Sequence, residues 1–112
     1  MNLNPGEVWL ADLGLAGKTR PVVIVSRHDL EPPRALAIYV PLTTQYRDSS
    51  YEVILPRLGF LDRDSIANVQ GIGSIPTVRL ERKLGRLPDD VMLKIKQAIL
   101  FALDLDPNLS EE

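Results

Sequence analysis

The chain reads Lys18-Thr19-Arg20-Pro21-Val22-Val23-Ile24-Val25-Ser26 at the point where a basic, polar segment turns into an apolar one. Four successive β-branched apolar residues leave no polar face, which indicates a strand buried on both sides at the centre of a sheet. Proline cannot donate to a strand ladder, so we expect Pro21 at the start of the strand, which we place over 20–26. Arg20 is therefore expected at the strand mouth, where a charge on a rigid element suits catalysis or binding.

A second apolar segment, residues 35–42, also ends in polar residues, namely Thr43-Thr44-Gln45-Tyr46-Arg47-Asp48. If the strands over 20–26 and 35–43 are neighbours, Arg20 and Thr43 approach each other at a common rim. Gln45 fits hydrogen bonding to a base edge, although Thr44 and Gln45 equally suit the satisfaction of turn backbone.

The rest of the chain predicts further short strands and one C-terminal helix. Strands are expected over 7–13, 51–56, 65–70 and 83–87, with a bend or bulge over 71–76 and a helical turn over 77–81. Pro88-Asp89-Asp90 predicts a helix start, because proline suits the first turn and carboxylates complement the helix dipole. This pattern describes a mainly β fold, a small antiparallel barrel with a terminal helix. We expect one domain over residues 1–104 and an acidic, flexible tail over 105–112.

Apolar residues surround the expected helix on more than one side. A packing stripe at helical spacing consists of Val91, Ile95, Ala98, Ile99 and Ala102. Met92, Leu100, Phe101 and Leu103 lie beside or across from that stripe. So much apolar surface on one helix indicates a second covering surface, such as another subunit.

Composition and charge limit the possible functions but do not identify one. The 112 residues are 45% apolar and 25% charged and contain no cysteine, which is typical of a soluble domain without disulfides or thiolate zinc sites. No segment reads as a signal peptide or a membrane span, so a cytoplasmic location is expected. The net charge is −2, but residues 1–88 hold eleven basic and nine acidic side chains, whereas residues 89–112 hold two and six. A basic rim for a nucleic-acid partner is therefore permitted.

Six segments in order resemble the MazF/PemK toxins, over residues 6 to about 104. They are Gly6–Leu13, Arg20–Ser26, Val40–Gln45, Tyr51–Val53, Asp64–Ala67 and Leu84–Pro88, followed by the helix. The resemblance implies an SH3-like barrel of the CcdB/PemK type that forms a homodimer with RNA in a groove across it. It also implies a metal-independent endoribonuclease, without cofactor, from a type II toxin–antitoxin module. The implied inhibitor is a MazE-like antitoxin whose flexible C-terminal segment occupies the same groove.

The resemblance also assigns residues. The catalytic arginine of the family matches Arg20, and its catalytic threonine matches Thr43. The expected RNA-binding residues are Lys18, Thr19, Thr44, Gln45 and Gln70. The implied reaction is attack of the 2′-hydroxyl on phosphorus, in which Arg20 suits the phosphoryl oxygens and Thr43 adds a neutral donor.

Two departures from the family pattern concern RNA recognition. The loop before Arg20 is only Gly14–Thr19, shorter than in many members. Many members also place acidic and basic residues around the glutamine that follows the Asp-Ser strand, and neither accompanies Gln70. We expect these changes to alter the RNA sequence preference.

Other readings stay open at the level of sequence. His28 is expected at the surface, and Trp9 and Tyr39 can stack on bases or pack in the core. A basic cluster can contact phosphates or form a solvated face with Glu81; it consists of Arg79, Arg82, Lys83 and Arg86. The same fold also hosts gyrase poisons, and an attenuated RNA- or protein-binding barrel is a third possibility.

Overall fold

The computed structural model describes residues 1–14, 18–106 and 108. Much of the expected acidic tail, and residues 15–17 of the loop before Arg20, lie outside the described residues. Within them the strands are β1 (Glu7–Asp12), β2 (Thr19–Ile24), β3 (Leu36–Thr43), β4 (Glu52–Ile54), β5 (Ile66–Asn68), β6 (Gly73–Pro76) and β7 (Leu80–Arg86). The helices are the 3₁₀ turns η1 (Val69–Gly71) and η2 (Thr77–Arg79) and the α-helix α1 (Asp89–Ala102).

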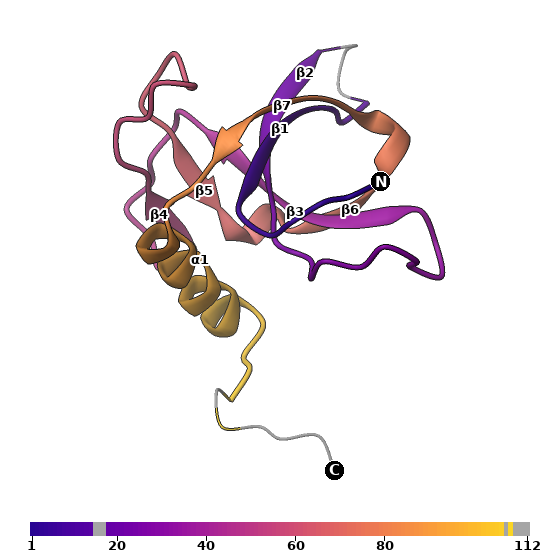
Figure 1. Cartoon of the computed structure of the whole chain (residues 1–112). Coiled ribbons are helices and arrows are strands. Elements are labelled where there is room, and N and C mark those ends of the chain that lie inside the picture. The colour runs from indigo at the N-terminus through magenta and orange to yellow at the C-terminus, as the bar shows by residue number, and fades with distance from the viewer. Residues whose placement is uncertain (15–17, 107, 109–112) are drawn as a thin grey trace.

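The strands form one antiparallel sheet in the order β4-β5-β3-β2-β1-β7, with β6 paired to β3. Figure 1 shows β1, β2, β3, β6 and β7 curling round a ring, while α1 lies beneath β4 and β5. The prediction of a mainly β, antiparallel barrel with a C-terminal helix is confirmed. No helix among the described residues is long and apolar enough to cross a membrane.

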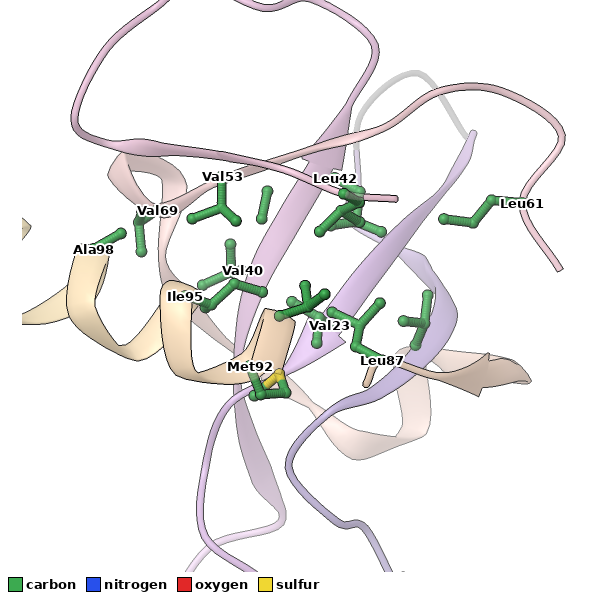
Figure 2. Close-up of a cluster of buried hydrophobic side chains, with 14 residues drawn as sticks. Val23, Val40, Leu42, Val53, Leu61, Val69, Leu87, Met92, Ile95 and Ala98 are labelled. Atoms are coloured by element: carbon green, nitrogen blue, oxygen red, sulfur yellow. The ribbon is translucent and has the colours of Figure 1, made fainter. Parts of the chain in front are cut away.

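The predicted central strand lies between β1 and β3. Its alternate side chains enter two different cores, because Val22 and Ile24 pack in one cluster and Val23 packs in the other. The cluster that contains Val23 joins the sheet to α1, as Figure 2 shows. Its members include Val40, Val53, Val69 and Ile95. Burial on both faces explains why this strand carries no polar residue beyond Pro21.

The helical turn expected over 77–81 ends at Arg79, because β7 begins at Leu80 and not at residue 83. Three further details of the predicted elements were wrong. Pro21 is the third residue of β2 and pairs with Leu10; the ladder to β3 begins only at Val22, so proline lies where β2 has a neighbour on one side. Val69 and Gln70 leave the strand for η1, because the Asn68 side chain caps that turn. Residues 73–76 continue as the strand β6 rather than breaking the ladder.

Helix α1 buries three of the five residues of the predicted stripe, whereas Ile99 and Ala102 are half-buried. Val91, Ile95 and Ala98 are buried, and Met92, which was placed beside the stripe, is buried with them. Leu93, Phe101 and Leu103 are at least half exposed, at 57%, 56% and 50%. The apolar excess predicted for this helix therefore lies on the surface of the single chain.

The barrel also buries one carboxylate, Glu7, which is 5% exposed. Burial alone would raise the pKa of Glu7, but hydrogen bonds from Trp9 Nε1 (3.2 Å), Lys83 Nζ (3.2 Å) and Asn4 Nδ2 (3.3 Å) outweigh it and hold the pKa below its ordinary value of 4.5. Because the pKa of Glu7 is lower in the folded state than in the unfolded state, its ionised carboxylate stabilises the fold at pH values above the unfolded-state pKa. This contribution is lost as the pH falls through the folded-state pKa.

We predict that Glu7→Gln lowers the free energy of unfolding at pH 7 by about 1–3 kcal/mol, because charge-assisted hydrogen bonds are lost. The variant should also lose less stability than the parent as the pH falls below 4.5, the ordinary pKa of this carboxyl. Urea unfolding at several pH values measures both effects. Glu81→Gln, at an exposed position of β7, is the control. Parallel pH profiles for parent and Glu7→Gln would contradict the assignment.

Candidate active site

A cavity of about 590 Å³ opens where β2 begins and β3 ends. We call it the first cavity. The residues that line it are Leu10, Arg20, Pro21, Leu42, Thr43, Thr44, Gln45, Phe60, Leu61, Asp62, Arg63, Ser65, Arg82 and Leu84. Four of the residues singled out from the sequence, Arg20, Thr43, Thr44 and Gln45, therefore share one cavity.

Strand register explains why Arg20 and Thr43 meet. Strand β2 pairs with β3 so that Val22 faces Pro41 and Val23 faces Val40. Arg20 lies two residues before Val22, and Thr43 lies two residues after Pro41, so both residues lie just beyond the same end of this ladder. Their side chains line the same cavity from two adjacent strands.

The Thr43 hydroxyl is held by the turn that follows it. Its Oγ1 accepts a hydrogen bond from the backbone N–H of Gln45, at 3.1 Å. That bond engages a lone pair of the oxygen and leaves the hydroxyl proton to donate to a ligand. Thr43 can therefore act as an oriented neutral donor.

The first cavity carries an excess of positive charge. Arg20, Arg63 and Arg82 line it and are exposed, against one carboxylate, Asp62. Among the described residues, the two ion pairs join Arg57 to Asp64 and Lys83 to Glu7, so neither engages a cavity arginine. Three guanidiniums around one opening suit an anionic ligand, and their planar donors match phosphate oxygens.

A second cavity of about 510 Å³ adjoins the first. The residues that line it are Thr43, Gln45, Arg47, Ser49, Tyr51, Glu52, Asn68 and Gln70. Thr43 and Gln45 line both cavities, and Gln70 lines only the second. Gln70 thus lies in the cavity next to the one that holds Arg20, and its RNA-binding role stays a prediction.

Lys18 and Thr19 line neither cavity. Thr19 opens β2 and pairs with Asp12, and both Lys18 and Thr19 are exposed. Their RNA-binding role stays a prediction that rests on their position directly before Arg20.

The alternative residues occupy ordinary structural places. His28 is exposed, and its Nε2 lies 2.7 Å from Asn2 Oδ1, away from both cavities. Trp9 and Tyr39 pack against the core cluster that contains Val22. The basic cluster is split, because Lys83 pairs with Glu7 while Arg82 lines the first cavity.

Sequence reasoning missed Asp62 and Arg63, which lie in the segment between β4 and β5. Phe60 packs this segment over β7, where Gly85 leaves space for the ring; a Cβ at Gly85 would overlap Phe60. The alternating charges of Asp62-Arg63-Asp64 were the available signal. No group of three potential metal-ligating side chains occurs among the residues that the structure describes.

Fold and site together define a small β-barrel protein with an arginine-lined cavity at the rim of its central strands. The sequence profile of the PemK-like, MazF-like toxins of type II toxin–antitoxin systems matches residues 4–103. The chain belongs to this family.

Relatives and solved structures agree with that assignment. The probable endoribonuclease MazF5 of Mycobacterium tuberculosis is 36% identical over 100 residues, which cover 88% of this chain and 91% of the relative. A mycobacterial endoribonuclease in complex with its cognate antitoxin superposes with a TM-score of 0.82 at 28% identity, covering 93% of this chain and 97% of that one. The M. tuberculosis toxin MazF-mt6 gives a TM-score of 0.79 at 29% identity, with coverage of 89% and 98%.

Proposed function

We propose that the protein is an endoribonuclease toxin that cuts single-stranded RNA without a metal ion. The observation that carries this proposal is that Arg20 and Thr43, from the adjacent strands β2 and β3, line one cavity together with two further arginines. Membership of the toxin family and the similarity to named endoribonucleases support it. Because its substrate is cellular RNA, we propose a cytoplasmic location.

The proposed reaction is an internal transfer on the phosphodiester. The 2′-oxygen forms a bond to phosphorus while the bond from phosphorus to the 5′-oxygen breaks. The 2′-hydroxyl loses its proton, and the departing 5′-oxygen gains one. The products are a 2′,3′-cyclic phosphate and a 5′-hydroxyl. Charge accumulates on the non-bridging oxygens in the transition state, where preorganised donors stabilise it.

Each residue has a distinct task in this proposal. Arg20 binds the non-bridging oxygens through its fork of N–H donors. The Thr43 hydroxyl donates a hydrogen bond to the same oxygens, and the Gln45 N–H holds this hydroxyl in position. Thr44, Gln45 and Gln70 contact the RNA beside the scissile phosphate, with Lys18 and Thr19 on the approach to Arg20.

We also propose two protein partners. A second copy of the chain covers exposed apolar side chains of α1, such as Leu93 and Phe101, because several exposed apolar side chains on one helix favour association with another protein surface. A cognate MazE-like antitoxin binds the cavity surface through a flexible C-terminal segment and excludes RNA. The antitoxin complex of the mycobacterial endoribonuclease supports the second partner.

Purified protein incubated with a long single-stranded RNA in EDTA tests the proposal. We expect cleavage that does not depend on divalent cations, with 2′,3′-cyclic phosphate ends identified by their resistance to phosphatase until acid treatment. Cleavage that requires Mg²⁺ would contradict the metal-independent reaction. Intact RNA together with trapped DNA breaks in the presence of gyrase would instead identify a gyrase poison.

A further inference from the structure

The second cavity lies where the nucleotide next to the scissile phosphate would bind. Thr43 and Gln45 form the boundary that it shares with the first cavity. A strand whose scissile phosphate lies on Arg20 and Thr43 therefore brings an adjoining base to the second cavity. What that base meets depends on the hydrogen-bonding groups that the cavity presents.

The amide of Gln45 presents its nitrogen. Its Oε1 accepts a hydrogen bond from Arg47 Nη2 at 3.3 Å. A guanidinium nitrogen only donates, so the amide atom facing it is fixed as the oxygen by chemistry. The NH₂ of Gln45 is therefore the group left for a ligand.

The amide of Asn68, which also lines the second cavity, likewise has its oxygen engaged. Its Oδ1 accepts from the backbone N–H of Gln70 at 3.2 Å, which caps η1. A backbone N–H also only donates, so the oxygen is committed to the turn and the NH₂ is left for a ligand. Ser49 follows the pattern, since its Oγ accepts from the N–H of Tyr51 at 3.3 Å.

The carboxylate of Glu52, which lines this cavity, accepts hydrogen bonds from the backbone. Glu52 Oε1 accepts the N–H groups of Arg47 (3.2 Å) and Ser49 (3.1 Å), and its Oε2 accepts that of Arg47 at 3.1 Å. Among the described residues, Glu52 is the one carboxylate that lines the second cavity, and it holds the loop that carries Arg47. Gln45, Asn68 and Arg47 therefore keep N–H donors for a ligand, whereas the carboxylate of Glu52 is engaged by backbone N–H groups.

We propose that the second cavity is a nucleobase subsite that selects a carbonyl edge, so that uracil or guanine is preferred over cytosine or adenine beside the scissile phosphate. The inference rests on the proposed ribonuclease function and deepens it. Uracil O4 and guanine O6 accept hydrogen bonds, whereas cytosine and adenine carry an amino donor at the corresponding position. An amino group opposite the NH₂ groups of Gln45 and Asn68 would leave donors facing donors.

Binding of octamers of 2′-deoxyuridine and 2′-deoxycytidine, measured by fluorescence anisotropy, tests this subsite. Neither octamer has a 2′-hydroxyl, so binding is measured without cleavage. We expect the deoxyuridine octamer to bind about tenfold more tightly, the size of discrimination that paired base-edge contacts give. Asn68→Asp keeps the oxygen that accepts from Gln70 N–H and replaces the donor by an acceptor, so it should abolish or reverse the preference.

Ser74→Asp is the matched control, because it adds the same charge at an exposed position of β6 that lines neither cavity. It should keep the preference for deoxyuridine. Equal binding of both octamers by the parent, or an unchanged preference in Asn68→Asp, would overturn the subsite. Cleavage of RNA by the same parent preparation separates the two proposals. A parent that cuts RNA without discriminating the octamers refutes the subsite alone. A parent that discriminates without cutting refutes the nuclease alone.

Discussion

Replacing Arg20 by alanine lowers the rate of RNA cleavage by about 10²–10³-fold, the usual effect of removing one preorganised transition-state donor. Arg20 is exposed at the end of β2 and lines the first cavity, so the substitution removes the guanidinium without opening the core. The free energy of unfolding should change by no more than about 0.5 kcal/mol, as at other surface sites. Single-turnover cleavage of a short RNA at saturating enzyme measures the rate.

Two further variants sharpen this result. Arg20→Lys keeps the charge but loses the planar fork of donors, so its rate should lie between those of the parent and Arg20→Ala. Arg27→Ala removes an exposed arginine that lines neither cavity and should leave the rate unchanged. Cleavage by Arg20→Ala at the parental rate would remove this residue from the mechanism.

Replacing Ile95 by alanine lowers the free energy of unfolding by about 2–5 kcal/mol, the range for truncating a buried large aliphatic side chain. Ile95 is 0% exposed and packs in the core cluster that joins α1 to the sheet (Figure 2). Native domains are stable by only about 5–15 kcal/mol, so this loss is a large share of the total. Urea unfolding followed by circular dichroism measures it.

Leu93→Ala provides a control on the same helix. The substitution has the same helical context, but Leu93 is 57% exposed in the single chain. At protein concentrations where the chain is monomeric, the change should stay within about 0.5 kcal/mol. Equal losses for Ile95→Ala and Leu93→Ala would show that α1 does not pack on the sheet by the face described above.

The presence of Arg20 and Thr43 in one cavity could be predicted because it depends on two apolar runs. A strand with no polar face must be central, and the next apolar run along the chain was its nearest candidate neighbour. Register then follows from the burial pattern, since a slip of one residue would turn Val23 out of its core cluster. The two apolar runs were therefore sufficient to predict that both residues lie at the same end of neighbouring strands.

The opposite side of the site could not be predicted in the same way. Asp62 and Arg63 lie in a segment without hydrophobic periodicity, and they reach the cavity through the packing of Phe60 over Gly85. That contact joins residues distant in sequence. Gln70 was assigned to a strand, but a local bond from Asn68 to the backbone competes with the ladder and starts η1 instead.

The central claim is that one guanidinium and one hydroxyl act on the same phosphodiester, and a double-mutant cycle of Arg20→Ala and Thr43→Val measures it most directly. Residues that stabilise one transition state as a unit give non-additive losses. We therefore expect the double variant to cleave RNA almost as fast as Arg20→Ala alone. Losses that multiply across the two substitutions would show that the side chains act independently, and would contradict the account.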